Sequence, residues 1–190
     1  MTDIAKVHRQ ALDATGQIVA RIGADQWDAP TPCAEWTARQ LLNHVVAGNW
    51  WAAELARGAT IDEVGTRLDG DVLGADSTDA YERSAEAAAA AFDAPGALDA
   101  PCAVSYGPVP GSVYAAHRFL DVLIHGWDLA VATGQDARLD PVLAEACLIV
   151  VEPQADRLRG SGMFGDHVAT DDEADTRTRL LALLGRTPPS

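Results

Sequence analysis

The stretch FLDVLIHGWDLAVATG, residues 119 to 134, constrains the fold more than any other part of this sequence. It belongs to a segment, residues 112 to 134, in which apolar residues recur at helical spacing and spread onto most sides of the expected helix. A helix that is apolar on most sides is buried, so other elements must surround it. The segment therefore predicts the central helix of a helical domain.

Further segments carry helical periodicity that is bounded by capping residues, glycine or proline. Thr37 and Gln40 form a T-x-x-Q capping box, and Pro153 should kink or end the helix that it follows. With the central segment, the predicted helices cover residues 3–22, 38–57, 77–94, 112–134, 141–152 and 173–185.

The connections between these segments are rich in glycine, aspartate or proline. Residues 58–76 are predicted to be loop with some short helix, and residues 95–111 an ordered loop. The sequence indicates no strand ladder and no internal repeat. We therefore predict an all-α fold, a four-helix bundle with extra short helices, in a single domain that spans residues 1–190.

The charge balance narrows the possible partners. The chain has 14 Lys and Arg against 28 Asp and Glu, a formal net charge of −14. Phosphate binding needs clustered Lys and Arg, so we expect no nucleic acid and no anionic membrane surface as a partner. No apolar run is long enough to span a membrane, and the N-terminal residues lack the apolar core of a signal peptide. We expect a cytoplasmic protein, and three widely spaced cysteines predict no disulfide framework.

Two polar residues stand out inside the apolar helix. Asp121 and His125 are four residues apart and share one face, with His117 one turn before them and Asp128 one turn after. A buried carboxylate costs several kcal/mol unless a hydrogen bond, a counter-charge or a metal compensates for it. The pattern predicts such a compensation at Asp121.

A second helix offers a partner for this pair. His44 lies on the apolar line of residues 38–57 and should point inward. Two imidazoles and one carboxylate are a common three-ligand set for a divalent metal, and bundles build such sites on facing helices. The alternatives are a plain ion pair between Asp121 and His125 and a core position for His44.

For several other residues the sequence leaves two interpretations open. Three tryptophans either wall a pocket or pack in the core; these are Trp50, Trp51 and Trp127. His117 is a pocket-mouth residue or a support for the site, and Arg118 either holds an acidic substrate or is an exposed helix arginine. Cys33, just before a helix, is a structural residue or a nucleophile. His8 and His167 are predicted to lie on the surface or in loops.

Three parts of the sequence resemble the short, metal-binding actinobacterial branch of the mycothiol-dependent maleylpyruvate isomerase family. They are TPCAEWTARQLLNHVVAGNWW, GPVPGSVYAAHRFLDVLIHGWDLAVATG and RLLALLGRTP. The resemblance covers nearly the whole chain. It implies a DinB-like, up-down-down-up bundle with a long crossover. It also implies a metal site at His44, Asp121 and His125, with zinc preferred and nickel possible, and mycothiol or a similar thiol as cosubstrate.

Two departures limit what the resemblance implies. The isomerase pattern has Glu where this chain has Asp121, and the sequence lacks the second domain of full-length maleylpyruvate isomerases. The resemblance therefore implies the metal site more strongly than the isomerase substrate.

Two classes of function remain open. The first is a metal- and thiol-dependent transferase or isomerase that acts on a small electrophile, with Trp51, His117 and Arg118 near the substrate. The second is a non-catalytic bundle that binds a metal or a ligand. Either would be a monomer or a homodimer.

Overall fold

The computed structural model describes residues 3–34, 36–158, 165–171 and 173–188. Four long helices form its bundle; they are α1 (Ile4–Val19), α2 (Ala38–Ala56), α4 (Ser77–Asp93) and α5 (Gly111–Ala132). Together with α6 (Pro141–Val151) and α8 (Thr176–Leu183), they begin and end within about three residues of the predicted bounds. The predicted all-α bundle is confirmed.

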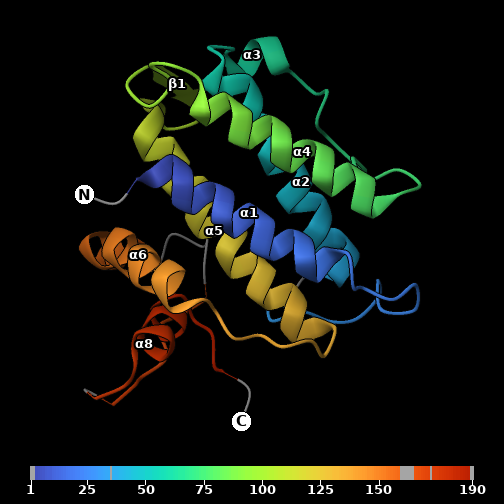
Figure 1. Ribbon diagram of the computed structural model, residues 1–190, viewed down its shortest axis with the longest axis vertical. Helices are drawn as coiled ribbons and strands as arrows, with labels where there is room; N and C mark the ends of the chain where they lie inside the picture. The colour runs from blue at the N-terminus through green and yellow to red at the C-terminus, as the bar shows by residue number, and fades with distance from the viewer. Residues whose placement is uncertain (1–2, 35, 159–164, 172, 189–190) are drawn as a thin grey trace.

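The four helices have the up-down-down-up order that the resemblance implied. Figure 1 shows α1 and α5 running in one direction and α2 and α4 in the other. The long connection from α2 to α4 lets these two helices lie parallel, and it contains the short α3 (Ile61–Val64). In cross-section α5 packs against α1 and α2, which accounts for its nearly continuous apolar surface.

Local signals set the ends of the helices. The Thr37 hydroxyl accepts a hydrogen bond from the backbone N–H of Gln40 at 3.3 Å, and the Thr37 N–H donates to Oε1 of Gln40 at 2.9 Å. The predicted capping box is therefore present. Helix α6 ends just before Pro153, where the chain continues as a 3₁₀ turn, η1 (Glu152–Gln154), and then as α7 (Ala155–Leu158). Proline lacks the N–H that a continuing α-helix needs, so this break was expected.

The loop prediction for residues 95–111 is wrong in part. The chain there forms a hairpin of β1 (Pro101–Val104) and β2 (Gly107–Pro110), paired antiparallel. Each strand of a two-stranded sheet is an edge, where proline's missing N–H need not break the ladder. Gly107, with φ at +112°, allows the tight turn after Val104. The hairpin packs on α2 and α5 through the buried Cys102.

One histidine prediction is wrong and one is confirmed. His167 is exposed, as expected. His8 is fully buried in α1 against Phe92, with a ring-centroid distance of 5.2 Å. Neither ring nitrogen of His8 has a hydrogen-bond partner, and burial, aided by the charges of Arg118 and Arg9, lowers its pKa to about 3.

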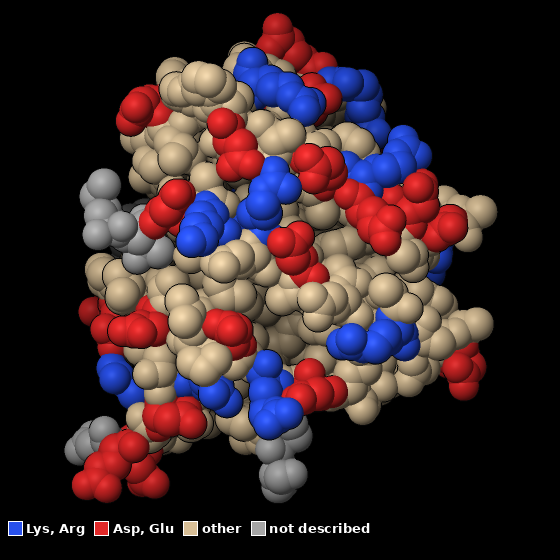
Figure 2. Space-filling view, viewed as in Figure 1, with Lys and Arg blue, Asp and Glu red and all other residues tan. Residues whose placement is uncertain are grey.

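Helices α6 and α8 pack against each other beside the bundle (Figure 1). All three cysteines are free. Among the described residues, no helix is long and apolar enough to cross a membrane. On the face drawn in Figure 2, basic side chains lie beside acidic ones and do not gather into one patch.

Candidate functional site

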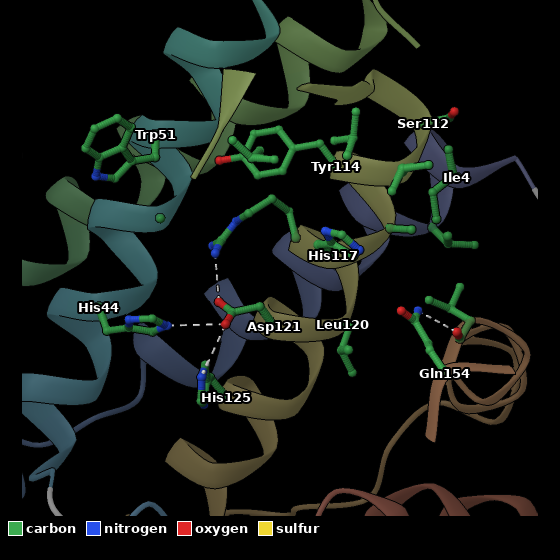
Figure 3. A pocket seen from close by; sticks show the side chains of 18 of the residues that line it. Ile4, His44, Trp51, Ser112, Tyr114, His117, Leu120, Asp121, His125 and Gln154 are labelled. Carbon is green, nitrogen blue, oxygen red and sulfur yellow. Dashed lines mark hydrogen bonds and ion pairs between the residues drawn. The ribbon is translucent and has the colours of Figure 1, made fainter. Parts of the chain in front are cut away.

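The structure brings His44, Asp121 and His125 together (Figure 3). Nε2 of His44, on α2, lies 3.2 Å from Oδ1 of Asp121, and Nε2 of His125 lies 3.4 Å from the same oxygen. The three ligand atoms all lie within 4.8 Å of one another. This group, the His44 cluster, forms where α2 and the antiparallel α5 face each other.

Arg118 holds the second oxygen of the Asp121 carboxylate. Its Nη1 donates to Oδ2 of Asp121 at 2.9 Å, and its Nη2 donates to Oδ1 of Asn49 at 3.2 Å. The prediction of an exposed helix arginine is wrong, because Arg118 is only 7% exposed. Gly48 makes room for it: a Cβ at that position would lie 2.6 Å from Cζ of Arg118. Asp121 thus presents one oxygen to arginine and the other to the histidines.

The charges in the His44 cluster stabilise each other. Burial alone would raise the pKa of Asp121, but the charges of Arg118 and His125 outweigh it and hold this pKa well below its ordinary value. Burial would likewise lower the pKa of His125, but the Asp121 carboxylate raises it well above its ordinary value. Asp121 and His125 thus each favour the charged form of the other.

A second group of polar residues lies on the other side of the His125 ring. Nδ1 of His125 is 3.1 Å from Oδ2 of Asp128, and the Cys33 thiol donates to the same oxygen at 3.3 Å. Arg186 donates to this carboxylate twice, from Nη2 at 2.8 Å and from Nε at 3.2 Å. We call Cys33, His125, Asp128 and Arg186 the Cys33 cluster.

In the Cys33 cluster Cys33 is half-buried, the other three residues are buried, and the charges are compensated. Asp128 is completely buried, which raises the pKa of its carboxyl group, but hydrogen bonds from His125 and Arg186 lower this pKa below its ordinary value. Nη2 of Arg186 is also 3.1 Å from Sγ of Cys33. Cys33, His125 and Asp128 have metal-ligand spacing, but the guanidinium between them disfavours a cation there.

A wide cleft of about 2450 Å³ opens over the His44 cluster. Trp51, His117 and Arg118, the predicted substrate-binding residues, all line it. His117 contacts the hairpin, with its Nδ1 2.7 Å from the Tyr106 hydroxyl. Of the other predicted pocket tryptophans, Trp127 is buried in the core and Trp50 is half-buried against it.

Sequence reasoning gave no role to Asp128, Arg186 or Tyr106. Asp128 follows His125 by three residues, a spacing that places both on one helix face, so a signal was present. Arg186 lies in the terminal LLGRTP run, whose approach to Asp128 no local pattern predicts.

Comparisons with known proteins agree with the resemblance. A sequence model of the family described as "Mycothiol maleylpyruvate isomerase N-terminal domain" matches residues 8–130, more than half of the chain. Two uncharacterized proteins of Mycobacterium tuberculosis, from strains CDC 1551 / Oshkosh and ATCC 25618 / H37Rv, are similar to it. Each is 40% identical over 190 residues, which cover 97% of this chain and 98% of the relative. No solved structure matches significantly.

Proposed function

Since the chain belongs to the mycothiol maleylpyruvate isomerase family, we propose that it is a metal-dependent transferase or isomerase that uses mycothiol or a similar low-molecular-weight thiol. Its second substrate would be a small electrophile. The observation that supports this best is the convergence of His44, Asp121 and His125 in a cleft, with ligand atoms within 4.8 Å of one another.

The residues of the His44 cluster fit a divalent metal. Two imidazole nitrogens and one carboxylate oxygen suit zinc, and also nickel, and leave positions for other ligands. Zn²⁺ supplies Lewis acidity and lowers the pKa of a thiol that coordinates it. Asp has a shorter side chain than the Glu of the isomerase pattern, and Arg118 supports it by fixing Oδ2 so that Oδ1 faces the histidines.

The surrounding residues orient the three ligands. Asp128 accepts a hydrogen bond from Nδ1 of His125, which leaves Nε2 directed at the His44 cluster. Supporting carboxylates of this kind fix the ring and strengthen histidine as a ligand. The cleft of about 2450 Å³ exceeds the ~300–1,000 Å³ typical of one drug-sized ligand, so a thiol and an electrophile fit together.

We further propose that the protein works in the cytoplasm as a monomer or homodimer, with residues 1–190 as one domain. Three free cysteines suit a reducing compartment.

Elemental analysis of protein purified without a His-tag tests the proposal. We expect about one equivalent of zinc or nickel, its loss in His44→Ala, and its retention in His167→Ala, a control at an exposed histidine. Thiol-conjugation assays with mycothiol would follow on the metal-loaded protein.

Metal retained in His44→Ala would refute the ligand assignment. A metal-free wild type, even after reconstitution, would leave Asp121 and His125 as an ion pair. Metal without thiol-dependent turnover would favour the non-catalytic bundle.

A further inference from the structure

Solvent-exposed large hydrophobic side chains gather at the cleft. Among the described residues, five such side chains are exposed, and four of these line the cleft: Ile61, Tyr106, Val113 and Ile149. The fifth, Val142, lies elsewhere on α6. Exposed apolar side chains scattered singly need no explanation, but a group around one cavity indicates a binding surface.

The inner walls of the cleft are apolar as well. Trp51 and Leu55 of α2 and Tyr114 of α5 line it together with Val109 of the hairpin. In Figure 3 the Trp51 and Tyr114 rings lie at the same end of the cleft, away from His125. A flat, apolar molecule would find aromatic and aliphatic surface there.

The cleft offers no uncommitted arginine or lysine to an acidic substrate. Arg118 and Arg186 are the only basic Lys or Arg residues among its described lining residues, and both are buried. Arg118 donates to Asp121 and Arg186 donates to Asp128. Removing either guanidinium from its carboxylate would leave a buried charge uncompensated, which is costly.

Outside the His44 cluster, the remaining charged residues of the cleft are acidic. Asp3 and Asp99 add carboxylates to its lining, and the chain carries a formal net charge of −14. Away from the His44 cluster, an acidic ligand would lose hydration and gain no counter-charge along these walls.

We propose that the electrophile of this cleft is uncharged and largely apolar, with its apolar part against the exposed aliphatic and aromatic side chains that line the cleft. This inference rests on the proposed function, and it departs from the family's name, since maleylpyruvate is a dicarboxylate. The thiol then occupies the end of the cleft near the His44 cluster, and the apolar walls hold the acceptor.

Direct binding tests the proposal without turnover. The probe is 1-N-phenylnaphthylamine, an uncharged dye that fluoresces in apolar sites, and it is displaced by 2-naphthylmethanol or by 2-naphthoate. The two competitors share one ring system and differ in charge. We expect the alcohol to displace the dye at concentrations at least about tenfold lower than the naphthoate, because ring burial is common to both and only the anion pays for desolvation.

Matched variants on α6 locate the binding surface. Ile149 is 59% exposed and lines the cleft, whereas Val142 is 66% exposed and does not. Ile149→Glu should weaken dye binding about tenfold, while Val142→Glu should leave it unchanged. Val113→Lys should improve naphthoate binding by supplying the missing cation.

Each outcome decides the question. Equal displacement by the two competitors, or equal effects of the two glutamate variants, would overturn the proposal. Metal content measured on the same samples separates the two failures. If the protein binds metal but the two competitors displace the dye equally, the proposed function stands and the proposed substrate class is refuted. If the alcohol displaces the dye at lower concentrations than the naphthoate but the protein binds no metal, the proposed metal-dependent function is refuted. The proposal of an apolar binding surface then stands.

Discussion

The two clusters that share His125 have similar donor atoms but different surroundings. Residues of both clusters line the cleft, but the side chains of His44 and Asp121 are 38% and 21% exposed. In the Cys33 cluster, the Asp128 side chain is fully buried. An arginine binds the carboxylate of each cluster, and the position of that arginine distinguishes the two clusters.

At the His44 cluster, the arginine binds the carboxylate oxygen that faces away from the histidines. Arg118 binds Oδ2 of Asp121, and Oδ1 faces the two imidazoles. In the Cys33 cluster, Arg186 contacts both Asp128 and the Cys33 thiol, so the guanidinium itself stands among the donor atoms. Ligand spacing alone therefore does not distinguish the two clusters, and the position of the arginine favours a cation at the His44 cluster over one at the Cys33 cluster.

The largest expected effect is the loss of the metal in Asp121→Asn. An amide is a far weaker ligand than a carboxylate, and this change also leaves Arg118 buried without its counter-charge. Elemental analysis should find about a tenth of an equivalent of metal per protein, or less. If Asp121→Asn keeps its metal and Asp128→Asn loses it, the roles of the two clusters are reversed.

Arg186→Met should destabilise the protein by about 3–5 kcal/mol, because Asp128 would remain buried without its main counter-charge. Urea denaturation measures this change. Arg138→Met is the matched control: Arg138 pairs with Asp136 on the surface, at 2.7 Å, and such pairs contribute about 1 kcal/mol or less. Similar losses in both variants would contradict the supporting role of Arg186.

His8 provides a baseline for a buried histidine that has no carboxylate. Its folded-state pKa of about 3 lies below the ordinary 6.5, so the unfolded chain takes up the proton first as pH falls. Its contribution to stability is thus full above pH 6.5 and is lost towards pH 3. Between pH 7 and pH 5 the wild type should lose about 2 kcal/mol more than His8→Leu does. Identical pH profiles in urea denaturation would exclude a neutral, buried His8.

Asp128→Asn should weaken metal binding by about 10–100-fold without abolishing it, which is the usual effect of losing a supporting hydrogen bond to a ligand histidine. Competition with a chelator of known affinity measures the change. An unchanged affinity would show that His125 needs no orientation from Asp128.

Cys33→Ser should have the smallest effect. Serine keeps a hydrogen bond to Asp128, so we expect stoichiometric metal and a change in stability of about 1 kcal/mol or less. Loss of the metal from Cys33→Ser would place the metal in the Cys33 cluster.

The sequence predicts the helices well because their signals are local. Helical periodicity, the Thr37 capping box and the break at Pro153 each depend on residues a few positions apart, and the structure contains all three. The convergence of His44 with Asp121 and His125 followed from two local facts. His44 lies on the apolar line of its helix, and Asp121 and His125 share one face of theirs. Whether these residues bind a metal stays a prediction.

The errors have different causes. Arg118 is buried because Gly48 of another helix leaves space and Asp121 supplies a counter-charge. His8 follows Ile4 by four residues, so the helical spacing did indicate an inward position. A fully buried histidine without a hydrogen-bond partner is rare, however, and this rarity favoured the surface prediction. The hairpin was missed because its prolines are typical of loops.

Gly48 has a consequence for attempts to engineer this protein. Glycine within a helix is less favourable than alanine by about 1 kcal/mol, so a screen for thermostability would select Gly48→Ala among the first substitutions. At this position the added methyl group would occupy the space of the Arg118 guanidinium, with Cζ only 2.6 Å away. The arginine would have to leave Asp121, and a substitution chosen for robustness would instead release the carboxylate that the rest of the bundle holds in place.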